Sequence, residues 1–206
     1  MFSAVVFTAG RSGSHLVIDN LSTYFKTPKR HWWDNSFKYG VVHSHNPLYR
    51  PPNDNFICII NTRKDEFAAM ISMLITVRTN EFMHYSNKSI DPFEISKDEF
   101  IGMYNYFKCF YKSICLTGFK KVIEIEYEPL IADPKYLFSK FDLDQQTVYN
   151  LKKSPYDYRE LITNLDDIKK LYLELLSTNI SEDQLRDFKD NIVTDLTNIR
   201  NKNTQS

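Results

Sequence analysis

The chain has 206 residues, 42% hydrophobic and 15% aromatic, and its 26 lysines and arginines equal its 26 aspartates and glutamates. This balance gives no overall positive charge that would favour a nucleic-acid partner. The length suits one well-packed domain rather than two. We therefore expect a single domain over 1–206, with a C-terminal helical extension at 165–200 and a frayed tail at 201–206.

The cysteines and the hydropathy pattern indicate the cellular compartment of the protein. Cys58, Cys109 and Cys115 are odd in number and lack metal-type spacing, which argues against a disulfide framework or a zinc site. No charged leader precedes a long apolar run, so neither a signal peptide nor a membrane anchor is predicted. We expect a cytoplasmic protein with no membrane partner.

Apolar runs and helical patterns alternate along the first two thirds of the chain. Four short runs predict buried strands, at 4–7, 39–42, 56–60 and 122–125. Three longer segments with helical spacing predict helices, at 14–25, 65–77 and 97–116. This alternation predicts an α/β fold: three αβα layers around a central, mainly parallel, P-loop-like sheet, with sites at the carboxyl ends of the strands.

The remaining segments carry weaker patterns. Residues 79–96 are polar and without a period, which predicts a loop able to cover a pocket. Short helices are expected after Asp133-Pro134, followed by two C-terminal helices at about 165–176 and 181–200. Ser181 is followed three residues later by a glutamine, which resembles a capping box.

The segment after the first strand, Thr-Ala-Gly-Arg-Ser-Gly-Ser-His at 8–15, predicts an anion site. A strand, a small-residue turn and a helix start bring the N–H groups of 11–15 and the positive end of a helix dipole to one point. Arg11 adds a permanent cation whose planar donor fork suits oxyanions. The loop is not a Walker A sequence, because no Gly-Lys-Ser/Thr closes it.

The other strand ends also carry polar side chains. His43 and His45 follow the second strand on the same face, with Ser44 opposite, and histidine readily accepts a proton near neutral pH. Arg63 and Ser72 follow the third strand, with Asp65 as a helix cap between them, and can bind a second phosphate. Tyr127 follows the fourth strand and can present its ring to a base or a hydroxyl.

Each of these residues has a structural alternative. A small-residue turn occurs without a ligand, strand-end histidines are usually solvated, and an arginine such as Arg63 often forms only a surface ion pair. Ser72 and Tyr127 can simply pack. Trp32 and Trp33 can anchor a loop or line a pocket. The functional interpretation is favoured because the polar clusters fall at the ends of consecutive strands of one predicted sheet.

Four segments resemble the sulfotransferases that use 3′-phosphoadenosine 5′-phosphosulfate (PAPS). Residues 8–16 look like their 5′-phosphosulfate loop, and Thr-Arg-Lys-Asp with Ser72 looks like their 3′-phosphate motif, nearest to a bacterial branch. His-Ser-His-Asn-Pro at 43–47 is similar to their Lys-Thr-His-Leu-Pro. Residues 127–134 are similar to their Tyr-Glu-Asp-Leu segment.

The resemblance implies roles for individual residues. It implies that the cofactor is held by Arg11, Ser12, Gly13, Ser14, His15, Arg63, Ser72 and Tyr127. It also implies that His45 is the catalytic base, with His43 and His15 as alternatives, that Arg11 assists catalysis, and that no metal is needed.

Two features depart from the family's pattern. The cytosolic enzymes close over the cofactor with a late Gly-rich segment, whereas this chain has no glycine after Gly118, which leaves Lys152 or Lys153 as substitutes. The bacterial branch uses a glutamate base, but no glutamate precedes Glu66.

The function implied is transfer of a sulfuryl group from PAPS to an acceptor hydroxyl or amine, with adenosine 3′,5′-bisphosphate as the nucleotide product. The acceptor is a small molecule, a carbohydrate or another hydroxyl-bearing compound, and the oligomeric state is open. The alternatives are a P-loop kinase-like phosphotransferase and a non-catalytic nucleotide-binding module.

Overall fold

A computed structural model describes residues 1–31, 38–79, 90–147 and 157–203, the last ten of these only in their backbone. Its centre is a five-stranded sheet in the order β2-β3-β1-β4-β5, in which every neighbouring pair is parallel. The strands are β1 Ser3–Phe7, β2 Lys29–His31, β3 Gly40–Ser44, β4 Ile57–Thr62 and β5 Lys121–Glu126.

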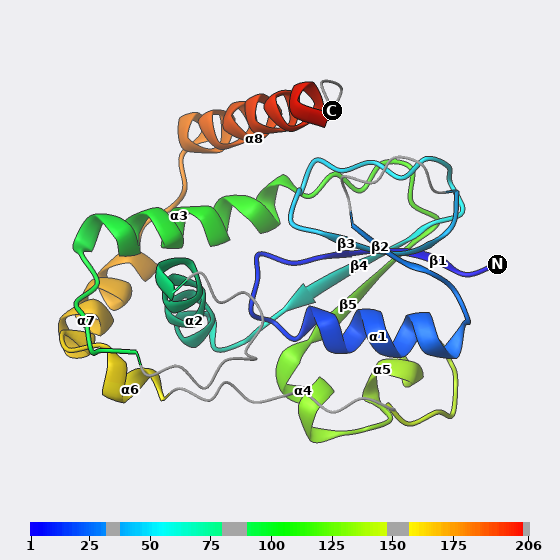
Figure 1. Cartoon of the computed structure of the whole chain (residues 1–206), viewed down its shortest axis with the longest axis horizontal. Coiled ribbons are helices and arrows are strands. Elements are labelled where there is room, and N and C mark those ends of the chain that lie inside the picture. Colours follow the sequence, from blue (N-terminus) through cyan, green and yellow to red (C-terminus); the bar gives the residue numbers. More distant parts are fainter. Residues whose placement is uncertain (32–37, 80–89, 148–156, 204–206) are drawn as a thin grey trace.

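Helices cover both faces of this sheet (Figure 1). One layer contains α1 Ser14–Tyr24, α4 Tyr127–Ala132 and α5 Tyr136–Ser139. The opposite layer contains α2 Glu66–Thr79 and α3 Lys97–Ser113. The later helices α6 Tyr158–Leu161, α7 Leu165–Leu176 and α8 Glu182–Asn203 lie on the same side as α2 and α3. The expected three-layer α/β architecture is therefore confirmed.

The core lies on both sides of the central strand β1. Val5 and Phe7 pack into the cluster that α2 and α3 cover, whereas Ala4 and Val6 pack into the cluster under α1. All four side chains are fully buried. A parallel strand buried on both faces reads as a continuous apolar run, which explains why this strand was visible in the sequence.

Gly40 sets the start of β3 beside the segment that leads into β2. Its φ of +127° lies in the region that favours glycine, and a Cβ there would approach the Pro28 carbonyl oxygen to 2.6 Å. The same carbonyl accepts the N–H of Val41 at 2.9 Å. Glycine is thus required for this close approach at the beginning of the strand.

Most boundaries agree with the sequence-based expectation. Asp65 caps α2 by accepting the Ala68 N–H at 3.0 Å, and α7 begins and ends where predicted. The Ser181 capping box forms through reciprocal bonds with Gln184, at 2.9 and 3.1 Å.

Other boundaries differ from the expectation. Strand β2 was missed because its three residues are polar or charged, and α3 ends at Ser113 rather than near 116. Short helices were expected only after Asp133-Pro134, but α4 already begins at Tyr127. Helix α8 continues to Asn203, into the segment predicted as a frayed tail, and 204–206 lie outside the described residues.

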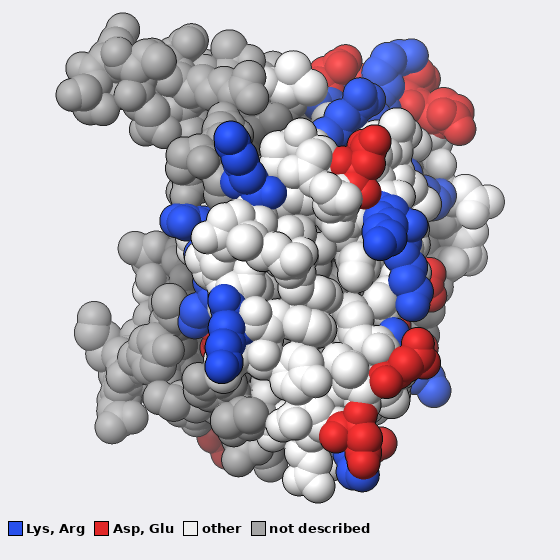
Figure 2. All heavy atoms as spheres, turned by 90° about the vertical axis from the view of Figure 1, so that its right-hand side faces the viewer, with Lys and Arg blue, Asp and Glu red and all other residues white. Residues whose placement is uncertain are grey.

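Several expectations fall on residues that the structure does not describe. They are residues 80–89 of the covering loop expected at 79–96, the pair Trp32 and Trp33, and Lys152 and Lys153. Among the helices that are described, none combines the length and the apolar character needed to cross a bilayer. Figure 2 looks onto the amino ends of the strands, where basic and acidic side chains are interspersed around an uncharged centre.

Candidate functional site

Three segments meet at the carboxyl ends of the central strands. Strand β1 lies between β3 and β4, and Phe7 pairs with Ser44 on one side and with Ile60 on the other. The loop 8–13 that follows β1 therefore lies between the residues that follow β3 and those that follow β4. This convergence is the geometry expected of a site in a parallel sheet.

The loop 8–13 has an unusual backbone that hydroxyl groups hold in place. Gly10, Arg11 and Gly13 have positive φ angles of 112°, 56° and 73°. The Thr8 hydroxyl accepts the Gly10 N–H at 3.0 Å and shares a 2.6 Å hydrogen bond with the Ser12 hydroxyl. A non-glycine residue with φ above zero is uncommon, so the conformation of Arg11 depends on these surrounding contacts.

The start of α1 leaves backbone donors available. The Gly13 carbonyl accepts the N–H groups of Leu16 and Val17, and α1 has no side-chain cap. Within the described residues no hydrogen bond uses the N–H groups of 11–15. Unused donors at the positive end of a helix dipole attract an anion.

Arg11 and Arg63 come together at this loop although they are far apart in sequence. Arg11 donates from Nε to the Ser72 hydroxyl at 3.0 Å, and Arg63 donates from Nη1 to the Arg11 carbonyl at 3.3 Å. The Arg63 guanidinium lies over the Tyr127 ring, 4.7 Å from its centroid. The structure thus brings the predicted residues Arg11, Arg63, Ser72 and Tyr127 into one contiguous cluster.

The cluster has a local excess of positive charge. Burial lowers the pKa of Arg11, and the neighbouring Arg63 charge lowers it further. No carboxylate among the described residues forms an ion pair with either arginine. The nearby Glu128 instead accepts the N–H groups of Lys64 and Asp65 at 3.0 and 3.1 Å. An anion placed between the two guanidinium groups would relieve their mutual repulsion.

The hydroxyls of Ser12 and Ser14 form hydrogen bonds within the protein. The Ser12 hydroxyl faces the interior, where it bonds to Thr8 and to the Asn61 carbonyl at 3.3 Å. The Ser14 hydroxyl is hydrogen-bonded to Nε2 of His43 at 3.1 Å. In this arrangement both serines offer a ligand their backbone N–H groups rather than their side chains.

Four histidines gather beside the loop. The rings of His43 and His45 lie on the same face, as predicted, with centroids 4.4 Å apart. His15 and His31 lie 5.1 and 6.1 Å from His43. His31 was not foreseen, because it belongs to the strand that the sequence did not reveal.

The environment of each histidine separates the candidates for a catalytic base. Part of His45 is exposed, but its Nδ1 lies against the protein and donates to the Thr8 carbonyl at 2.9 Å, which leaves the Nε2 lone pair available in the neutral ring. His43 is buried and engaged with Ser14. Displacement of water by surrounding protein atoms lowers the pKa of His15, His43 and His45, so all three favour the neutral form.

Two residues that the sequence did not single out, Asn61 and Tyr111, tie the loop to its surroundings. Asn61 donates from Nδ2 to the Ser12 carbonyl at 2.8 Å, and Tyr111 donates to the Asn61 carbonyl at 3.0 Å. A polar residue at the end of a strand is a faint signal for Asn61. Tyr111 carried no signal, since it belongs to the apolar face of a predicted helix.

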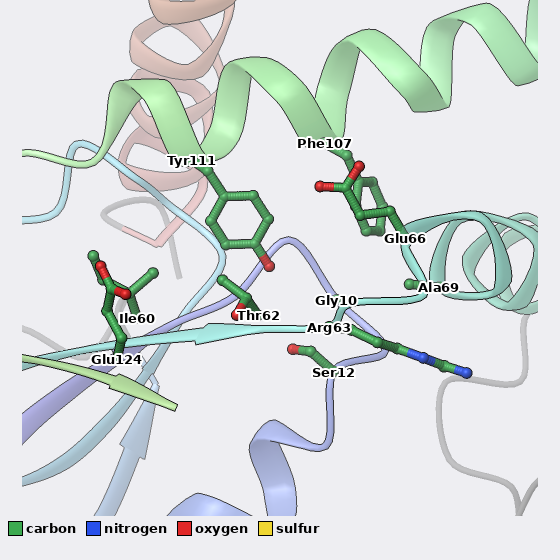
Figure 3. A pocket seen from close by; sticks show the side chains of 10 residues that line it. All are labelled: Gly10, Ser12, Ile60, Thr62, Arg63, Glu66, Ala69, Phe107, Tyr111 and Glu124. Carbon is green, nitrogen blue, oxygen red and sulfur yellow. The ribbon is translucent and has the colours of Figure 1, made fainter. Parts of the chain in front are cut away.

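A cavity of about 330 Å³ adjoins the loop on the side of α2 and α3 (Figure 3). Gly10, Ser12 and Arg63 form the side that it shares with the candidate site, and Phe107 and Tyr111 of α3 form another wall. Its size lies at the lower end of the range for small-ligand pockets. The lining contributed by β4, β5 and α2 consists of Ile60, Thr62, Glu66, Ala69 and Glu124.

Fold and site together define an α/β protein with a basic cluster at the carboxyl ends of a parallel sheet. In the part of the chain that the structure describes, no group of three or more histidine, cysteine, aspartate or glutamate side chains is arranged to hold a metal ion. Comparison with known proteins adds no relative, since no family model, no curated protein and no solved structure matches this chain.

Proposed function

We propose that this protein is a sulfotransferase that moves a sulfuryl group from PAPS to an acceptor hydroxyl or amine. The acceptor is a small molecule, a carbohydrate or another hydroxyl-bearing compound, with no role for nucleic acid or a membrane. A cytoplasmic location accords with Cys58, Cys109 and Cys115, which are free thiols.

One observation carries the proposal: Arg11 contacts Ser72, and Arg63 contacts the Arg11 carbonyl. The two phosphates of the nucleotide sit on one ribose, so the groups that hold them must be close neighbours. ATP and ADP carry their phosphates in a single chain and need no second anion site beside the first. A pair of adjacent anion-binding segments therefore favours a nucleotide with phosphates at both 3′ and 5′ positions.

The residues have distinct roles in this mechanism. The N–H groups of 11–15 and the Arg11 guanidinium hold the 5′-phosphate and the sulfate oxygens, where negative charge develops during transfer. Arg63 and Ser72 hold the 3′-phosphate by hydrogen bonds to its charged oxygens, and the Arg63 bond also carries a positive charge on the donor. Tyr127, which already stacks with Arg63, offers its ring near the nucleoside.

His45 is the base that this geometry favours. An acceptor oxygen forms a bond to sulfur while the bond from sulfur to the 5′-phosphate oxygen breaks, and Nε2 of His45 takes the acceptor proton. Its Nδ1–H bond to the Thr8 carbonyl holds the tautomer that this step needs. Positioning and charge supply most of the remaining rate enhancement, as in phosphoryl transfer.

The proposal is tested by ligand-dependent thermal stability of the full chain. Adenosine 3′,5′-bisphosphate at a hundred times its dissociation constant should stabilise the fold by about 2.7 kcal/mol, and ADP at the same concentration should stabilise it less. A preference for ADP would overturn the proposal and favour the phosphotransferase alternative. Bisphosphate binding with no sulfuryl transfer to any acceptor tried, and no effect of His45→Ala, would favour the non-catalytic module.

A further inference from the structure

Helix α3 forms hydrogen bonds to both segments to which the proposed function assigns a phosphate, namely the loop 8–13 and the Arg63–Ser72 segment. Its Tyr111 hydroxyl donates to the Asn61 carbonyl at 3.0 Å and lies 3.5 Å from the N–H of Ala9 in the loop. Asn61 in turn donates from its side chain to the Ser12 carbonyl at 2.8 Å. The Tyr111 hydroxyl therefore contacts the end of β4 and one side of the loop 8–13, and Asn61 ties the other side of the loop to the same strand end.

A second contact joins α3 to the Arg63–Ser72 segment. Lys108 forms a 2.5 Å ion pair with Glu66, the first residue of α2 and the third after Arg63. Lys108 and Tyr111 are three residues apart in a helix and so project from the same side. In Figure 3 the side of α3 that carries Tyr111 faces both the loop and the start of α2, where Glu66 lies.

The Tyr111 contact is made in a protected environment. Asn61 is fully buried, and Tyr111 forms a wall of the cavity beside it. Burial raises the pKa of Tyr111 to about 12, so the hydroxyl remains a hydrogen-bond donor throughout the neutral range. A hydrogen bond shielded from water holds its partners more rigidly than an exposed one.

We propose that Tyr111 is a positioning residue whose hydroxyl sets the spacing between the loop 8–13 and the Arg63–Ser72 segment, so that both grip one nucleotide at once. This inference rests on the proposed function. Tyr111 acts through Asn61 and Ala9 and needs no contact with the nucleotide.

The proposed role affects one class of ligand more than another. A bisphosphate engages both segments, and the second engagement is strong only when the spacing is correct, because it occurs at high effective concentration. Adenosine 5′-monophosphate engages the loop alone and does not sense the spacing. Loss of the Tyr111 hydroxyl should therefore reduce the selectivity for the bisphosphate rather than weaken all binding equally.

The experiment compares Tyr111→Phe with Tyr104→Phe. Tyr104 is a matched control on the same helix, since its hydroxyl also donates to a backbone carbonyl, that of Leu175 at 2.7 Å, but away from the loop. Affinities for adenosine 3′,5′-bisphosphate and adenosine 5′-monophosphate are measured by displacement of a labelled bisphosphate, with thermal unfolding recorded for each variant. Each substitution removes one hydroxyl, so both variants are expected to fold.

We expect Tyr111→Phe to lower bisphosphate affinity about tenfold, the effect of one well-formed hydrogen bond, and monophosphate affinity less than about twofold. Tyr104→Phe should leave the ratio of the two affinities unchanged. An unchanged ratio in Tyr111→Phe, or an equal loss for both ligands, would overturn the inference alone. If the unmodified chain shows no preference for the bisphosphate, the proposed function fails, and the inference fails with it.

Discussion

In the proposed function, Arg63 is the residue on which recognition of the second phosphate depends. Its guanidinium is held between the Arg11 carbonyl and the Tyr127 ring, so it is oriented before any ligand arrives. A preoriented side chain loses little conformational freedom on binding, which increases the share of its interaction energy that appears as affinity.

We expect Arg63→Ala to lower the affinity for adenosine 3′,5′-bisphosphate by about 10- to 150-fold, since a charge-assisted hydrogen bond contributes about 1.5–3 kcal/mol. Isothermal titration calorimetry measures this change. Arg78→Ala is the matched control, because Arg78 stacks on Phe93 at the far end of α2. Equal affinities for the Arg63 variant and the unmodified chain would contradict the assignment.

His45 is the second residue whose environment makes a specific prediction. Its Nδ1 faces a carbonyl oxygen, which can only accept, while its lowered pKa favours the neutral ring. We expect nitrogen-15 NMR at pH 7 to find His45 neutral, with the proton on Nδ1. A ring protonated on Nε2 alone, or on both nitrogens, would remove it as the base. His45→Ala, which deletes the signal, identifies the resonance.

At the scale of elements, the histidines connect α1, β2 and β3. His15 lies in the first turn of α1, His31 ends β2, His43 lies in β3 and His45 directly follows that strand. The ring centroids of His15, His31 and His45 lie within about 6 Å of the His43 centroid. The charge of Asp19 favours protonation of His15, but burial and the surrounding cations outweigh it. Protonation of the cluster would place like charges side by side and disfavour this packing.

This packing predicts that acid destabilises the fold. Burial lowers the pKa of His43 well below its ordinary value of 6.5, so below that pH the unfolded chain binds more protons than the folded one. The free energy of unfolding should therefore fall between pH 7.5 and pH 5.5, by about 1 kcal/mol for His43 at the lower limit. Carboxylates such as Glu99 and Glu128, whose pKa values are lowered, contribute only at more acidic pH.

Chemical denaturation across that range measures the effect, and His43→Gln should reduce the pH dependence. Stability that stays constant or rises as the pH falls to 5.5 would show that burial does not hold His43 neutral.

At the scale of the whole molecule, the sheet brings three loops to one edge and supplies them with donors from backbone and arginine. Binding that relies on fixed protein donors does not require a bridging cation. We expect the stabilisation by adenosine 3′,5′-bisphosphate to be the same in EDTA and in Mg²⁺, as measured by thermal unfolding. A strict requirement for Mg²⁺ would favour the kinase-like alternative, in which the metal bridges phosphate oxygens.

Local patterns in the sequence were sufficient for much of the architecture. The run at 4–7 predicted β1, because a strand buried on both faces must be apolar throughout. Asp65 and Ser181 predicted helix starts, because their side chains satisfy nearby N–H groups. The lysine, arginine and histidine of β2 show no such pattern, and an edge strand of three residues leaves no period to detect.

The sequence by itself also determined the position of the small-residue turn and the chemistry of the side chains after each strand, since both depend on residues that are neighbours in the chain. Only the tertiary structure decided that Arg11 reaches Ser72, that the Ser12 hydroxyl turns inward, and that His31 and Tyr111 join the site. These contacts join segments separated by the order of strands and the layering of helices. Periodicity encodes which face of an element is buried, but not which distant element covers it.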